Sequence, residues 1–159
     1  MSDAEHTAGA AAPSTTGVPL VQRIRLIVVA VFVLGIFVQV YLAGRGAFGA
    51  SSFSAHRTFG DILGWFPPAV LVLTLLHRRT RNRIDIIHAI LLLVLFEVQF
   101  ALADLQHPQV GAFHPVNGLL ILLVALSLFR RDLRSIRSGD EPRWYARTGL
   151  SRVNSAEAS

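Results

Sequence analysis

The chain has 159 residues, of which 52% are hydrophobic, and its mean hydropathy of +0.50 is too high for an ordinary soluble domain. It contains no cysteine, which excludes disulfides, thiolate metal sites and cysteine nucleophiles. The formal net charge is +5 and all of the Lys+Arg residues are arginine, but their distribution fits membrane topology better than a nucleic-acid partner.

Four apolar segments dominate the chain, and a helix needs about 20 mostly apolar residues to cross the hydrocarbon core. They cover residues 26–44, 56–76, 84–103 and 113–129. In the second, Pro67-Pro68 predicts a kink near mid-membrane. We expect a disordered N-terminal tail over residues 1–22 and a basic C-terminal tail over 132–159. The prediction for 23–131 is an all-α transmembrane up-down four-helix bundle.

The arginines indicate how this bundle is oriented. Most lie before the first span, between the second and third, or after the fourth, whereas only Arg45 and Arg57 lie on the opposite side. Cytoplasmic loops carry an excess of arginine and lysine. We therefore expect a multi-pass protein of the cell membrane, most simply a bacterial inner membrane, with both termini cytoplasmic.

An internal repeat relates the two halves of the predicted bundle. Gln39, near the end of the first span, recurs 60 residues later as Gln99 within a similar local sequence. His56, which opens the second span, recurs 58 residues later as His114. These two matches in register predict a duplicated helical hairpin. Repeats related by an axis along the membrane normal bring equivalent residues face to face.

Each repeated histidine precedes a glycine by four residues, as His56 with Gly60 and His114 with Gly118. Residues four apart share a helix face, so each glycine leaves space beside an imidazole for a flat macrocycle. The second and fourth helices of an up-down bundle lie diagonally, roughly 11–14 Å apart. This distance holds two imidazoles with an iron between them. We therefore predict that His56 and His114 are the axial ligands of one haem b per chain, near the outer face.

Other polar residues are placed to support such a cofactor. Gln39 and Gln99 lie on the other diagonal at similar depth, and Asn117 lies one turn from His114. Their side chains are candidates for hydrogen bonds around the haem. Arg57 and Arg45 lie on the outer side, where they are candidates to neutralise haem propionates. Their alternative role is contact with lipid headgroups.

The histidines and acids also allow other interpretations. Each of His56 and His114, taken singly, fits an interfacial residue at the end of a span. We expect interfacial or loop positions for His77, His88 and His107, and a lone metal or proton role is an alternative for His88. Asp61 and Glu97 fall inside spans, where a charge costs about 2.5–3.5 kcal/mol. They are expected to be protonated or to face the interior, either carrying protons or only packing.

With these residues in view, the chain resembles one four-helix half of haem A synthase, over roughly residues 24–131. The resemblance rests on His56-Arg57 at the start of the second span and His114 at the start of the fourth. The chain also resembles uncharacterised single-bundle bacterial membrane proteins with the same Gln-x-x-Leu-Ala and His-Arg pattern. In haem A synthase a glutamate precedes the first histidine by three residues, and here that position is Phe53. The resemblance therefore implies the fold and the cofactor rather than haem A synthesis.

The function expected from these features is haem binding or electron transfer by a membrane protein similar to b-type cytochromes. Two histidines fill both axial positions, which favours electron transfer over oxygen chemistry. If the protein is an enzyme, it is expected to be a membrane haem oxidoreductase. The expected partners are the lipid bilayer and a redox protein or quinone, with a homodimer as an option. The alternatives are a haem-free proton-coupled transporter and a small assembly subunit recognised through its basic tail.

Overall fold

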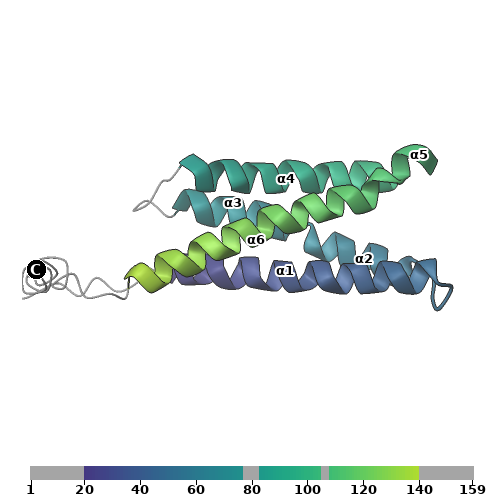
Figure 1. Ribbon diagram of the computed structural model, residues 1–159, viewed down its shortest axis with the longest axis horizontal. Helices are drawn as coiled ribbons and strands as arrows, with labels where there is room; N and C mark the ends of the chain where they lie inside the picture. Colours follow the sequence, from purple (N-terminus) through teal and green to yellow (C-terminus); the bar gives the residue numbers. More distant parts are fainter. Residues whose placement is uncertain (1–19, 77–82, 105–107, 140–159) are drawn as a thin grey trace, which may run out of the picture.

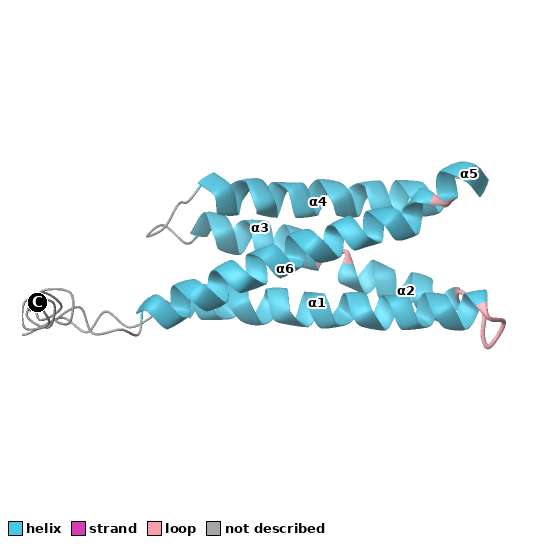
Figure 2. Ribbon diagram, in the orientation of Figure 1, coloured by secondary structure: helices cyan, strands magenta, loops and turns pink. Residues whose placement is uncertain are grey.

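A computed structural model describes residues 20–76, 83–104 and 108–139 of the chain. These residues form helices joined by short turns, with no strand in the described ranges (Figures 1 and 2). In chain order the helices are α1 (Leu20–Ala47), α2 (Ser54–Leu63), α3 (Phe66–Leu76), α4 (Arg83–Asp104), α5 (Pro108–Gly111) and α6 (Phe113–Gly139).

Four segments are long and apolar enough to cross a membrane: Leu20–Ala47, Ser54–Leu76, Arg83–Asp104 and Gln109–Arg137. Large apolar side chains are also exposed on the outer faces of these helices, such as Ile27, Leu34 and Leu123. A helix that is apolar on all sides is typical of a membrane span, because lipid covers what the core does not. The predicted all-α transmembrane four-helix fold is therefore confirmed, and the chain is a multi-pass membrane protein.

The second span is broken between α2 and α3, at Gly64 and Trp65 rather than at the prolines themselves. Pro67 and Pro68 occupy the second and third positions of α3, where a backbone N–H has no intrahelical partner to lose. The backbone N–H of Trp65 bonds to the Ile62 carbonyl at 3.4 Å, a tight turn that ends α2. The kink that the prolines predict is present, a few residues earlier than expected.

The helices pack in a closed ring. The spans that contact one another are α4 with α6, α6 with α1, α1 with α3, and α3 with α4. The spans that begin with α1 and α4 thus lie on one diagonal, and those of α3 and α6 on the other. Figure 1 shows α6 crossing obliquely, from beside α4 near α5 to beside α1 at its own C-terminal end. Phe32 lies at the centre of this ring, with its ring centroid 5.8 Å from those of Phe66 and Phe96.

The buried residues of the two hairpins follow the repeat. Each buried residue of α4 lies 60 residues after a buried residue of α1. Each buried residue of α6 from Ile121 onward lies 58 residues after a buried residue of α2 or α3. The pairs are Arg25/Asp85, Val29/Ala89, Phe32/Leu92, Ile36/Phe96, Leu63/Ile121, Pro67/Ala125, Val70/Leu128 and Thr74/Asp132. The same register therefore relates most of the described core, not only the glutamines and histidines that revealed it.

Two ends of the bundle carry polar side chains, and we name them by their residues. The histidine end holds His56 and His114, and the ionic end holds Arg25, Asp85 and Asp132. Helix α6 continues through the ionic end to Gly139, past the boundary at residue 132 expected for the tail. Asp132 itself is fully buried within the bundle.

Candidate functional site

The two repeated histidines meet at the histidine end. His56 is the third residue of α2 and His114 the second residue of α6, so both lie in the first turn of a helix. Their ring centroids are 6.0 Å apart and the ring planes make an angle of 66°. Both residues are partly buried. The structure thus brings together the two histidines that the repeat singled out, although 58 residues separate them in the chain.

This separation suits two imidazoles bound to one metal. An imidazole nitrogen binds a first-row metal at about 2.0 Å and lies roughly 1 Å from its ring centre, so two ligands in line have centroids about 6 Å apart. The observed 6.0 Å agrees with that value. Within the described ranges, no group of three or more His, Asp or Glu side chains could hold a metal ion. A metal held by these two side chains would therefore need a cofactor to supply its remaining ligands.

His56 is oriented by the neighbouring helix α1. Its Nδ1 atom lies 3.2 Å from the backbone carbonyl oxygen of Gln39. Because a carbonyl oxygen only accepts, Nδ1 carries the proton in this bond and Nε2 keeps its lone pair. Metal-binding histidines commonly donate their second N–H to such a carbonyl, which fixes the tautomer and the ring. His56 is therefore prepared to bind a metal through Nε2.

His114 is held more loosely. The backbone of Gln99, the repeat equivalent of Gln39, interacts with its imidazole. Nδ1 of His114 is nevertheless buried with no hydrogen-bond partner among the described residues. The two histidines therefore have equivalent surroundings but unequal anchors.

Each repeated glycine accommodates the glutamine of its own hairpin. A Cβ atom at Gly60 would lie 2.8 Å from Nε2 of Gln39, and one at Gly118 would lie 3.5 Å from Nε2 of Gln99. The space expected beside each imidazole for a macrocycle is instead filled by an amide side chain. Gly60 is the tighter of the two positions, because 2.8 Å is closer than real Cβ contacts.

The two glutamines differ in their hydrogen bonds. The Asn117 side-chain amide donates to Oε1 of Gln99 at 2.7 Å and to the Leu95 carbonyl at 2.8 Å. In the first hairpin Phe59 occupies the position equivalent to Asn117 and can donate nothing. Oε1 of Gln39 is consequently buried without a partner in the described part of the chain. An unpaired polar atom in an apolar site costs about 1–3 kcal/mol, so this atom marks where a bound group or water would fit.

The aromatic contacts of the two histidines also differ. The ring of Phe53 packs edge-on against His56, with centroids 6.2 Å apart. The same ring covers Gly46, where a Cβ atom would lie 2.7 Å from it. Gly111 is the repeat equivalent of Phe53, and a Cβ atom there would meet no described atom within 4 Å. An aromatic ring thus covers the His56 side, and the matching place beside His114 is open.

The remaining predicted site residues are more dispersed. Arg45 and Arg57 are exposed at the histidine end, as a role toward acidic groups at the bundle surface would require. Asp61 and Glu97 are also exposed, so the structure places neither carboxyl group in the bundle interior. His88 lies toward the other end, where its Nε2 is 3.2 Å from the hydroxyl of Ser127 and its Nδ1 is 2.7 Å from the Ile84 carbonyl. His77 and His107 lie outside the described residues.

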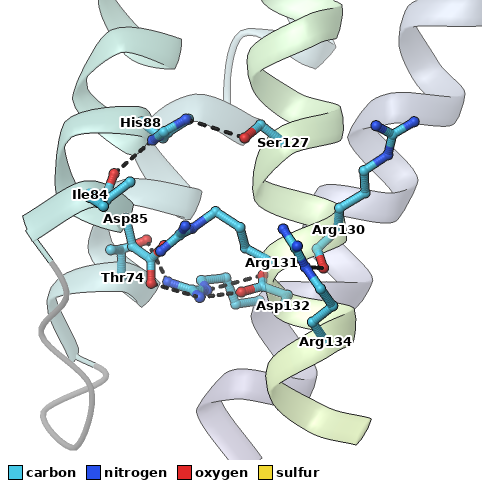
Figure 3. A network of polar contacts seen from close by, with 10 residues as sticks. Thr74, Ile84, Asp85, His88, Ser127, Arg130, Arg131, Asp132 and Arg134 are labelled. Atoms are coloured by element: carbon cyan, nitrogen blue, oxygen red, sulfur yellow. Dashed lines mark hydrogen bonds and ion pairs between the residues drawn. The ribbon is translucent and has the colours of Figure 1, made fainter. Parts of the chain in front are cut away.

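The structure also contains a buried ionic network that the sequence analysis did not find (Figure 3). Arg25 pairs with Asp132 through Nε and Nη2 of its guanidinium group, and its Nη1 donates to the Thr74 hydroxyl at 3.3 Å. Arg131 donates from Nε to Asp85 at 2.6 Å, and Asp85 lies 3.9 Å from Arg25. Two arginines and two aspartates therefore balance, with contributions from α1, α3, α4 and α6.

The repeat offered a signal for this network. Asp85 follows Arg25 by 60 residues, and Asp132 follows Thr74 by 58. Each of these two pairs therefore occupies equivalent buried positions in the two hairpins. Taken from the sequence alone, Arg25 indicates topology and Asp132 falls in the expected tail. Polar residues that recur at the two repeat offsets are the sequence signal of this network.

The fold and these sites define a multi-pass membrane protein made of two repeated helical hairpins, with a histidine pair at one end and an ionic cluster at the other. Residues 39–106, fewer than half of the chain, match a protein family of unknown function (DUF6220). The matched stretch includes Gln39, His56 and Gln99 but ends before His114. No curated protein and no solved structure was found to match the chain.

Proposed function

We propose that this protein is an integral membrane b-type haem protein in which His56 and His114 ligate one haem b. The observation that carries the proposal is the 6.0 Å separation of the two imidazole centroids, which suits a pair of axial ligands. When bound, the haem iron supplies a one-electron redox couple. Two protein ligands favour electron transfer or haem binding as the function, with a quinone or a second protein as the redox partner.

Several residues of the chain support this role. The Gln39 carbonyl fixes the tautomer of His56 so that Nε2 faces a ligand. The unpaired Oε1 of Gln39 is a buried polar atom in the same region, and a bound group would account for such an atom. Arg45 and Arg57 are exposed at this end and suit the two propionates of a haem.

The arginine distribution supports the orientation that we propose for the bundle. Arg23, Arg83, Arg130 and Arg137 are exposed at the ionic end, against Arg45 and Arg57 at the histidine end. By the positive-inside rule the ionic end and both termini are cytoplasmic, and the histidine pair lies at the outer face of a cell membrane.

The proton-coupled transporter finds less support than the haem protein. Its key residues are Asp61, Glu97 and His88. Asp61 and Glu97 have exposed carboxyl groups on separate helices, and the Nε2 atom of His88 already lies 3.2 Å from the Ser127 hydroxyl, whereas a transport path needs a series of polar groups that face the bundle interior. The resemblance to one half of haem A synthase supports the same cofactor. Phe53 stands where that enzyme has a glutamate, so we propose haem binding without haem A synthesis.

The test is the absorption spectrum of protein purified from haem-supplied cells, followed by a pyridine haemochrome assay. We expect a Soret band, sharp α and β bands on reduction, and one haem b per chain. The sharp bands should be lost in His56→Ala and in His114→Ala. His88→Ala is the matched control, because this histidine lies away from the pair, and it should keep the spectrum. A colourless wild-type protein would contradict the proposal.

A further inference from the structure

The two hairpins differ where their repeat equivalents meet the histidine pair, and two differences point in one direction. Nδ1 of His56 bonds to the Gln39 carbonyl at 3.2 Å, whereas Nδ1 of His114 has no partner among the described residues. Phe53 covers the His56 side, and its equivalent, Gly111, faces open space. Each difference makes His114 the freer residue.

The anchor affects how strongly an imidazole holds a metal. A hydrogen bond to the second nitrogen orients the ring and raises its basicity, and losing such a partner typically costs about 10–100-fold in metal affinity. His56 has this bond to the main chain of α1, so no rotamer change elsewhere removes it. His114 lacks it and can turn away at smaller cost. The two ligands of a bound haem would therefore be unequal in strength.

The surroundings of His114 are also more open than those of His56. The Phe53 ring lies between Gly46 and His56, and its edge contact with the imidazole shields that side from the outer end of the bundle. No described atom would lie within 4 Å of a Cβ at Gly111, three residues before His114. Gly111 ends the four-residue helix α5. Figure 1 shows α5 at the end of the bundle where α6 begins. A small molecule entering from this end meets the side of His114 first.

We propose that His56 is the permanent ligand and His114 an exchangeable one, so that a small neutral ligand of the diatomic class reaches the site from the Gly111 side. This inference rests on the proposed haem function and adds a ligand-binding activity to it. The chain would then combine an electron-transfer site with a site that senses or binds a small molecule at the outer face.

The first test compares haem retention in two variants. His114→Ala should keep haem in a five-coordinate, high-spin form, and added imidazole should restore the low-spin spectrum. His56→Ala should bind haem about 10–100-fold more weakly than His114→Ala, the range expected for the lost anchor. Far-ultraviolet circular dichroism of both variants shows whether each is folded. Equal haem affinity in two folded variants, or stronger binding in His56→Ala, would overturn the inequality.

The second test uses carbon monoxide on the reduced full-length protein, with variants that exchange the two repeat residues. Wild type should show the shifted Soret band of a carbon monoxide complex. Gly111→Phe should lose most of this shift because it covers the His114 side, whereas Phe53→Gly should keep it. A wild-type protein that contains low-spin haem but binds no carbon monoxide would overturn the inference and leave the proposed function standing. A colourless wild type would overturn both.

Discussion

Removing the Asp132 carboxylate should destabilise the bundle strongly, because it leaves the Arg25 guanidinium buried without its main partner. Arg25 is 4% exposed and Asp132 is fully buried, so water reaches neither. Breaking a buried ion pair on one side typically costs about 3–5 kcal/mol. Asp85 remains 3.9 Å from Arg25 and retains part of the attraction. We therefore expect Asp132→Leu to lower the free energy of unfolding by about 3 kcal/mol, the lower end of that range.

The double variant Arg25→Leu/Asp132→Leu separates the cost of an unpaired charge from the value of the pair. Replacing both partners by apolar residues is often neutral or stabilising, because the desolvation cost of the charges disappears as well. The double variant should therefore be more stable than Asp132→Leu alone. Exposed Arg130 provides the control, since Arg130→Gln should change stability by no more than about 0.5 kcal/mol.

Unfolding in mixed detergent micelles, followed by circular dichroism, measures these differences. If Asp132→Leu unfolds with wild-type stability, the carboxylate is not a buried partner of Arg25. If the double variant loses the sum of the losses measured for Arg25→Leu and Asp132→Leu, the two residues act independently, and their ion pair does not hold the spans together.

Two further predictions use single helix positions. Gly35→Ala should destabilise the bundle by about 1–3 kcal/mol, because its Cβ would lie 2.5 Å from Cδ2 of Leu63. Gly44→Ala on the same helix is the control: its Cβ would meet no atom within 4 Å, and it should stabilise the helix slightly. Equal changes in melting temperature for Gly35→Ala and Gly44→Ala would contradict the packing of Gly35 against Leu63. Asn117→Leu should lower the free energy of unfolding by about 1–3 kcal/mol, because it leaves Oε1 of Gln99 unpaired in the folded protein. Thermal unfolding of the detergent-solubilised protein measures this loss. Wild-type stability in this variant would show that the amide bond contributes little.

Much of the fold followed from the sequence. Span length, apolar composition and repeat offset can all be read directly from the order of residues, without knowing how the helices pack. The four spans, the diagonal pairing and the meeting of His56 with His114 all rest on such patterns. The kink shifted to Gly64 and Trp65, since prolines fit the first turn of a helix and the break falls just before them.

Features that depend on helix rotation could not be predicted in the same way. The sequence did not show that Gln39 fills the space beside Gly60, or that Asp61 and Glu97 face outward. A charged residue near a span end reads as a topology signal until the packing shows it to be buried, as with Arg25. The repeat offset still held part of this information, because it joins the members of the ionic network in pairs.

The most direct test of the histidine pair is electron paramagnetic resonance of the oxidised, purified protein, with iron and chain content measured on the same sample. The account predicts one low-spin ferric haem per chain with the signature of two imidazole ligands, and loss of that signature on changing either His56 or His114. A protein without iron, or a haem signal that survives both substitutions, would contradict the assignment of these two histidines as its ligands.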